Sequence, residues 1–272
     1  MTNTRTENIL DLSDLRGWAR VSSKVVNSIF PIELIKVITE IDHDEMYSDT
    51  LSFLIDSCIN FGFEIDGVFL DCDQWSELLD VEFKAEYTSI RAFHSCRTFK
   101  GLDSYKTRGI EKLSYDLLKE LAIETFSQHC KLEDINRAVD EQNIANFKKG
   151  VYLFTDKARP LDPSKNHYLQ SGSEILQALT SSLGIQSQAI LASQGKPYMI
   201  ECRIPIEDVA LVLRHELWRI LLTEHFQILA GGKNRDRPFD FCIRTNNNVS
   251  PGSILEFHEV NVSKIYSYAP TH

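Results

Sequence analysis

Arg91-Ala92-Phe93-His94-Ser95-Cys96-Arg97 has the alternation of a β-strand, and Gly109-Ile110 follows it after a run rich in Lys and Arg. We predict a strand over Tyr87–His94, followed by a basic loop that leads to Gly109-Ile110. Alternation puts His94 on the same side as small apolar residues. That position leaves room for a ligand, and it equally suits the core.

Further strands are predicted on both sides of this stretch, at Phe61–Asp66, Val68–Asp71, Val151–Thr155, Tyr198–Ile206, Ser253–Val262 and Lys264–Tyr268. Helices are predicted at Asn8–Val26, Pro31–Ile41, Met46–Asn60, Lys112–His129, Leu132–Phe147 (closed by Gly150), from Ser164 to Leu183 with an interruption at Gly172, and at Glu207–Leu229. Strands and helices do not alternate regularly, and no GxGxxG occurs. An α+β fold is therefore favoured over a doubly wound dinucleotide-binding sheet.

The composition is that of an ordinary globular protein. Of 272 residues, 43% are hydrophobic and 25% are charged, which fits one domain or one domain with a small companion. No apolar run approaches the roughly 18–20 residues that span a bilayer, and the N-terminus lacks the apolar segment of a secretion signal. The six cysteines show no CxxC spacing, which predicts reduced thiols and a cytoplasmic location.

Acidic residues are concentrated in the N-terminal third. Residues 1–90 hold 18 Asp and Glu against 6 Lys and Arg, a balance of −12, and residues 91–272 hold 21 against 23, a balance of +2. We predict an acidic, mainly helical region at 1–80 and a second domain at 81–272. A basic group in 91–112 has a balance of +4, which suits a phosphate-bearing ligand or an ordinary solvated loop; its cations are Arg91, Arg97, Lys100, Lys106, Arg108 and Lys112.

Two later segments, Gly150-Val-Tyr152-Leu and Ser164-Lys-Asn-His-Tyr168, complete a series of three motifs. Together with His94-Ser95 and the downstream Gly109-Ile110, they resemble the ADP-ribosyltransferase superfamily, in the branch related to poly(ADP-ribose) polymerases. The family motifs read His-Gly with a later Gly-Leu, Gly-Ile-Tyr-Phe, and Ser-Lys-Ser-Ala-Xaa-Tyr. The resemblance covers residues 87–268 and departs from the family at Ser95, where many relatives have Gly.

The resemblance implies a split β-sheet core behind an N-terminal helical region, with NAD as the substrate. It assigns contacts with NAD to His94, Arg97, Gly109, Tyr152 and Tyr168. Chemistry supports these residue types, because a neutral imidazole can hydrogen-bond ribose hydroxyls and a tyrosine ring can stack on nicotinamide. Tyr152 and Tyr168 also suit ordinary core positions.

The resemblance also requires one carboxylate, because cleaving the nicotinamide–ribose bond builds positive charge on the ribose. Glu174 follows Tyr168 after small residues that allow close approach to a ligand. Glu256 lies on a late predicted strand, where the family keeps its catalytic acid, and alternation puts it on one face with His258. Both remain open; Glu174 is slightly favoured because Gly-Ser-Glu after an aromatic residue resists a packing explanation.

Other chemistries find little support in the sequence. Cys96 and His94 are two residues apart on a strand, about 7 Å, with no third group to orient them as a cysteine nucleophile and its base. HExxH, GxSxG and P-loop motifs are absent, so we predict no metal site. The alternative to an enzyme is a catalytically degenerate member of the same fold that binds a nucleotide or a protein.

Bacterial transferases of this kind often act as toxins in toxin–antitoxin or phage-defence systems. The resemblance therefore implies transfer of ADP-ribose to a macromolecular acceptor, either protein or RNA. It also implies an antitoxin or another regulatory protein as a partner.

Overall fold

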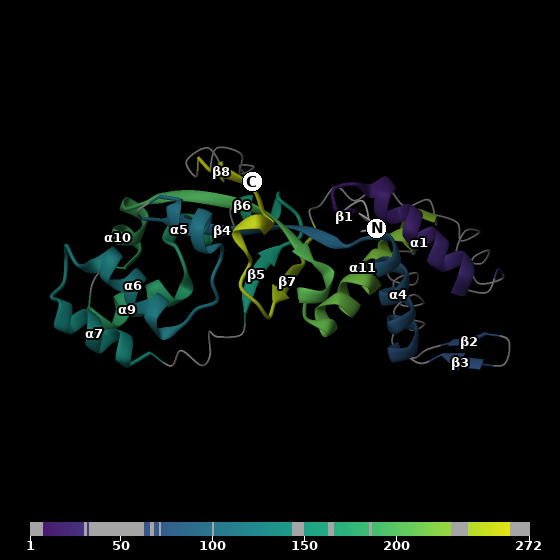
Figure 1. Cartoon of the computed structure of the whole chain (residues 1–272), viewed down its shortest axis with the longest axis horizontal. Coiled ribbons are helices and arrows are strands. Elements are labelled where there is room, and N and C mark those ends of the chain that lie inside the picture. The colour runs from purple at the N-terminus through teal and green to yellow at the C-terminus, as the bar shows by residue number, and fades with distance from the viewer. Residues whose placement is uncertain are drawn as a thin grey trace, which may run out of the picture. The chain divides into compact units, whose positions relative to one another are not determined.

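The computed structural model describes residues 8–29, 32, 63–65, 68–70, 72–99, 101–142, 150–162, 166–184, 187–229 and 239–261. The predicted helices at 31–41 (apart from Ile32) and 46–60 and the predicted strand at 264–268 lie outside these residues. The chain forms two compact units (Figure 1). The first unit comprises residues 1–90 with 205–237, and the second unit comprises 91–204 with 238–272.

In the described part of the first unit, three helices pack on one another: α1 (Leu15–Ile29), α4 (Cys72–Glu86) and α11 (Leu211–Leu229). Phe83 of α4 stacks on Trp218 of α11 with ring centroids 4.4 Å apart, and both are buried. The unit also contains β1 (Ile9–Leu10), β2 (Phe63–Ile65), β3 (Val68–Leu70) and the 3-10 turn η3 (Ile206–Asp208). The pairing of β2 with β3 is antiparallel, and the two strands confirm those predicted at 61–66 and 68–71.

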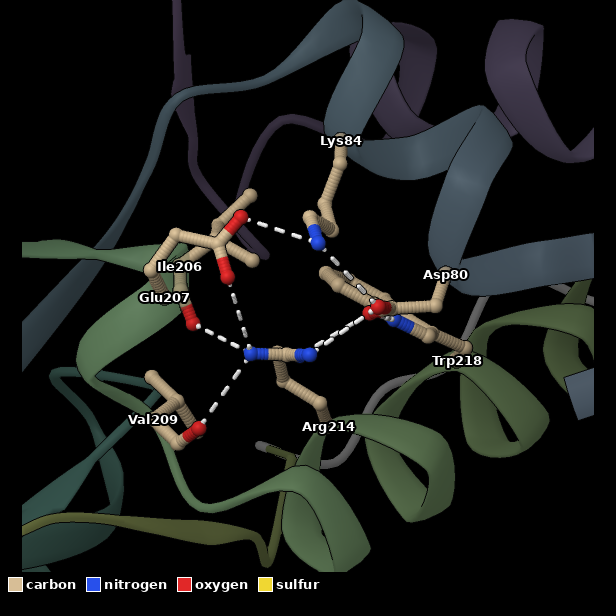
Figure 2. A network of polar contacts seen from close by, with 7 residues as sticks. All are labelled: Asp80, Lys84, Ile206, Glu207, Val209, Arg214 and Trp218. Carbon is tan, nitrogen blue, oxygen red and sulfur yellow. Dashed lines mark hydrogen bonds and ion pairs between the residues drawn. The ribbon is translucent and has the colours of Figure 1, made fainter. Parts of the chain in front are cut away.

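A buried ion pair joins α4 to α11. Asp80 accepts from Arg214 Nε at 2.9 Å, from Arg214 Nη2 at 3.0 Å and from the Trp218 indole at 2.9 Å. Arg214 Nη1 donates to the carbonyls of Ile206 and Val209. Figure 2 shows the guanidinium between Asp80 and these carbonyls, so one side chain fixes η3 against both helices. Lys84 lies between the carboxylates of Asp80 and Glu207 at the edge of the network (Figure 2).

The helix predicted over Asn8–Val26 is wrong at its start. Ile9 and Leu10 form β1, parallel to Ser89 and Ile90. The Asp11 carboxylate accepts from the backbone and hydroxyl of Ser13, and this local bond makes a turn that separates β1 from α1. The apolar residues do follow helical spacing, but the helix itself begins later in the chain, at Leu15. Likewise α11 begins at Leu211 rather than Glu207, because η3 occupies the preceding turn.

The second unit is built on a sheet with the strand order β7-β5-β4-β6-β8. Its strands are β4 (Ser89–Thr98, whose first two residues belong to the first unit), β5 (Val151–Phe154), β6 (Lys196–Pro205, whose last residue belongs to the first unit), β7 (Cys242–Thr245) and β8 (Ile254–Glu259). The pairings β4–β5, β5–β7 and β6–β8 are antiparallel. Mixed helix and sheet of this kind confirms the α+β class.

Helices of the second unit are α5 (Asp103–Arg108), α6 (Tyr115–Phe126), α7 (Leu132–Asp140), α8 (His167–Ser171), α9 (Glu174–Ser182) and α10 (Ser187–Ser193), with 3-10 turns η2 (Arg159–Leu161) and η4 (Pro251–Ser253). Figure 1 shows α6, α7 and α9 grouped together; their shared core includes Leu118, Phe126, Ile135 and Leu179. Ser114 caps α6 by accepting from the Leu117 backbone. Among the described helices, none has both the length and the apolar character needed to cross a bilayer.

Two further predictions are corrected in the second unit. The predicted basic loop contains α5. Gly150 does not end α7, whose C-cap is Glu141, but precedes β5 with φ of 142°. There a Cβ atom would lie 2.1 Å from the Thr245 carbonyl oxygen, so the close pairing of β5 with β7 requires glycine.

Candidate functional site

His94 lies in β4 against the neighbouring strand β5. Its Nδ1 is 3.2 Å from the Tyr152 carbonyl oxygen, a contact that favours a proton on Nδ1 and leaves Nε2 as an acceptor. Burial lowers the pKa of this imidazole, although the bond to Tyr152 opposes the shift. The ring is therefore neutral near pH 7, in the state that accepts from a hydroxyl.

The Tyr152 side chain faces solvent. It is 51% exposed, whereas Val151 and Leu153 on either side are buried. In the sheet, Tyr152 pairs with Arg244 of β7. The exposure excludes a core role for this ring and leaves an aromatic face open to a ligand.

Tyr168 and Glu174 lie on opposite sides of the break at Gly172, which ends α8. The Tyr168 hydroxyl donates to Glu174 Oε1 at 3.2 Å, and His167 Nε2 lies 3.6 Å from the same oxygen. Burial raises the pKa of Tyr168 well above its ordinary value, with Glu174, Cys242 and Tyr152 adding to the shift. The hydroxyl thus remains a donor at neutral pH.

Arg97 connects the first motif to the third. Its guanidinium donates to the carbonyls of Gln194 at 2.6 Å, Leu169 at 3.0 Å and Gly195 at 3.2 Å. These bonds tie β4 to α8 and to the turn before β6. The predicted contact with NAD would thus use a side chain that also holds α8 in place.

Gly109 ends α5 and lies against the chain before η4. It is buried with φ of 78°, and a Cβ atom there would lie 1.9 Å from the Val249 carbonyl oxygen. The next residue, Ile110, exchanges backbone hydrogen bonds with Val249. This geometry gives Gly109 a structural reason to be glycine that is separate from the predicted contact with NAD.

Among the described residues of the motifs, two carry buried polar atoms without a hydrogen-bond partner: Ser95 Oγ in the first motif and Asn166 Nδ2 in the third. Ser95 is 8% exposed and Asn166 is 1% exposed. A buried unsatisfied group costs roughly 1–3 kcal/mol, and such groups in native proteins call for an explanation. A polar ligand that reached these atoms would recover that free energy.

The predicted basic group is largely paired with acids and carbonyls. Arg91 contacts Glu201, Arg108 contacts Glu111 and Glu120, Lys106 contacts Asp103, and Lys112 donates to the Asn246 carbonyl. Lys100 lies outside the described residues. Because short-range pairing cancels much of the field, the expected positive potential beside His94 is weakened.

Glu256 belongs to a different cluster from Tyr152 and Tyr168. On β8 it lies in register with Glu201 of β6, and its Oε2 is 3.8 Å from His258 Nε2. His258 Nε2 is also 3.1 Å from Glu201 Oε2. The sequence predicted that Glu256 and His258 share a face. It did not predict Glu201 beside them, because Glu201 and His258 are 57 residues apart and lie on different strands.

Cys96 is buried, and burial raises the pKa of its thiol to about 12. A thiol with that pKa is protonated at neutral pH and is a poor nucleophile.

His167, like Glu201, was not singled out in the sequence analysis. Its ring lies 4.1 Å from that of Tyr168, and its place directly before Tyr168 in the third motif was the available signal.

Comparisons with protein-family models, with curated proteins and with solved structures find no match for this chain.

Proposed function

We propose that this chain is an NAD-dependent ADP-ribosyltransferase with a split β-sheet of that superfamily, and that its site lies in the second unit where β4 and β5 meet α8 and α9. One observation supports the proposal: a hydrogen bond joins the first two motifs, and another links Arg97, near the first motif, to the residue that follows the third. His94 contacts Tyr152 across 58 residues of chain, and Arg97 contacts Leu169, the neighbour of Tyr168, across 72.

Each group in this site suits one part of NAD. The exposed ring of Tyr152 offers a surface on which nicotinamide can stack. His94 Nε2 can accept from a ribose hydroxyl, and the unsatisfied Ser95 and Asn166 groups can bond other polar atoms. NAD is the substrate, and departure of nicotinamide leaves positive charge on its ribose.

Glu174 is the better candidate for the carboxylate that stabilises this charge. Its Oε1 is bonded to Tyr168 and lies beside His167, so it belongs to the same cluster as Tyr168. Glu256 is instead engaged with His258 and lies near Glu201. A carboxylate held by a neutral donor keeps its charge and its direction.

Nicotinamide release from NAD by the purified full-length chain tests the proposal. Glu174→Gln keeps the size of the side chain and removes its charge, so we expect turnover to fall by about 10²–10³ with a smaller change in NAD affinity. Glu256→Gln should stay within a few-fold of wild type, and Glu133→Gln, on the exposed surface of α7, serves as the control. If wild-type protein releases no nicotinamide with either protein or RNA acceptors, the proposal is wrong.

The second candidate is a degenerate transferase that binds a nucleotide or a protein without turnover. Ser95 in place of the family glycine favours it, as does the pairing of the basic group. Saturable NAD binding by calorimetry without nicotinamide release would select this candidate.

A toxin or phage-defence role adds a cellular expectation. Expression of the wild-type chain should arrest bacterial growth, and expression of Glu174→Gln should not. Labelled NAD would then show whether protein or RNA receives the ADP-ribose, and a protein that copurifies with the chain and restores growth would be the regulatory partner.

A further inference from the structure

Glu201, Glu256 and His258 bring three metal-ligating atoms together on one face of the β6–β8 pair. The carboxylate oxygens and the imidazole nitrogen all lie within 4.8 Å of one another. His258 Nε2 is 3.1 Å from Glu201 Oε2 and 3.8 Å from Glu256 Oε2. Two paired strands hold all three side chains, so the cluster is fixed by the sheet rather than by a loop.

The sheet pairs two like charges here, since Glu201 and Glu256 are in register on adjacent strands. Like charges directly opposite each other destabilise a strand pair. Arg91 Nε lies 3.1 Å from Glu201 Oε1, on the oxygen that does not face His258. It therefore orients Glu201 from outside the cluster and leaves Oε2 beside the imidazole.

The separations match those around a small divalent ion. Bonds of about 2.0–2.1 Å in a tetrahedral site place neighbouring ligand atoms about 3.3 Å apart. This distance lies between the separations of His258 Nε2 from Glu201 Oε2, 3.1 Å, and from Glu256 Oε2, 3.8 Å. Side-chain exposure rises from 15% at Glu201 through 33% at His258 to 65% at Glu256. One side of the cluster is thus open for an ion to enter and for water to complete its coordination.

We propose that Glu201, Glu256 and His258 bind one divalent ion of the zinc class through Glu201 Oε2, Glu256 Oε2 and His258 Nε2. One imidazole with two carboxylates is a mixed nitrogen and oxygen ligand set, which suits borderline ions such as Zn²⁺ better than Mg²⁺ or Ca²⁺. This site is separate from the cluster of Tyr168 and Glu174, and it does not rest on the proposed transferase function.

Titration of the full-length, chelator-stripped chain with ZnCl₂ by calorimetry tests the site. We expect saturable binding of one equivalent, and a rise in the melting temperature with added Zn²⁺. Glu256→Gln and His258→Asn should each weaken binding by at least about 100-fold, since loss of outer partners alone weakens metal sites 10- to 100-fold. Glu259→Gln is the matched control, because Glu259 lies next on β8 but contacts Lys196 and Tyr198 instead.

Absorption of the Co²⁺-substituted protein distinguishes this site from a thiolate site. Visible bands without strong sulfur charge-transfer bands, altered in His258→Asn, would support the proposal. Absence of saturable binding, binding that both variants retain, or a thiolate spectrum would overturn it. Nicotinamide release is measured separately on the same samples, so loss of one proposal leaves the other standing.

Discussion

Asp80 accepts the hydrogen bonds that join α4 to α11 in the interior of the first unit. Burial alone would raise the pKa of its carboxyl, but hydrogen bonds from Trp218 and Arg214 outweigh burial and lower the pKa below its ordinary value. A charge held this way stabilises the fold above the pKa of the unfolded state, and the stabilisation is lost as the pH falls through the folded pKa.

We therefore expect Asp80→Asn to destabilise the protein at neutral pH by about 3 kcal/mol, because the variant removes the buried carboxylate paired with Arg214 and leaves only the exposed Glu207 beside its charge. Urea unfolding across a pH series measures the effect. The difference from wild type should shrink as the pH falls through the lowered pKa of the folded wild-type carboxyl, where that carboxyl becomes protonated. Glu77→Gln, an exposed position on the same helix, should change stability by less than about 0.5 kcal/mol. A difference that stays constant down to low pH would contradict this role.

For single residues, the sequence indicated which residue types could act in a site, but not how exposed or how closely packed each one is. Sequence reasoning left Tyr152 divided between core and ligand, and its exposure decides against the core. Gly109 was assigned to NAD, and its contact with Val249 supplies a structural reason as well. Both depend on strands distant in sequence, so local patterns carried no information about them.

At the scale of elements, predictions held where the signal was local. The short strands β2 and β3 followed from two apolar runs close together in the sequence. Sequence reasoning missed α4 because its apolar residues include both buried Leu79 and Phe83 and exposed Leu78 and Val81, which blurs the helical stripe. It missed β7 because four residues paired to a strand about 90 positions earlier, Cys242 with Phe154, leave no local pattern.

The end of α5 offers a test with an internal control. Gly101 and Gly109 both have positive φ, 93° and 78°, but a Cβ atom meets nothing within 4 Å at Gly101 and clashes with the Val249 carbonyl at Gly109. Gly101→Ala should cost about 1–2 kcal/mol from backbone strain alone. Gly109→Ala should cost clearly more, because β-bridging at Ile110 must also shift. Thermal melting compares the two, and equal losses would show that the close approach is unimportant.

At the scale of the whole molecule, the predicted boundary between residues 80 and 81 does not coincide with the compact units. Residues 205–237 belong with the N-terminal part, and α11 packs on both α1 and α4. The acidic N-terminal region is therefore one part of a discontinuous unit. No pattern within 1–90 indicates this, because the helix that completes the core lies more than 100 residues later.

A chain that starts at Val81 should accordingly be poorly soluble. It lacks α1, and it lacks Asp80, so the buried faces of Trp218 and Arg214 on α11 lose their partners. The soluble fraction after expression, with the full chain expressed in parallel, measures this. A soluble, monomeric and active product would show that the second unit does not need the first.

The interleaving of the two units also bears on how the protein is made. The ribosome releases residues 1–90 before the 114 residues of 91–204, and only then the segment that closes the first core. At roughly 5–20 residues per second, that interval lasts about 6–23 seconds. During this interval the apolar faces of α1 and α4 do not yet have α11 to pack against. Nascent chains stalled before residue 205 should therefore bind chaperones, whereas chains released beyond residue 237 can bury these faces on their own.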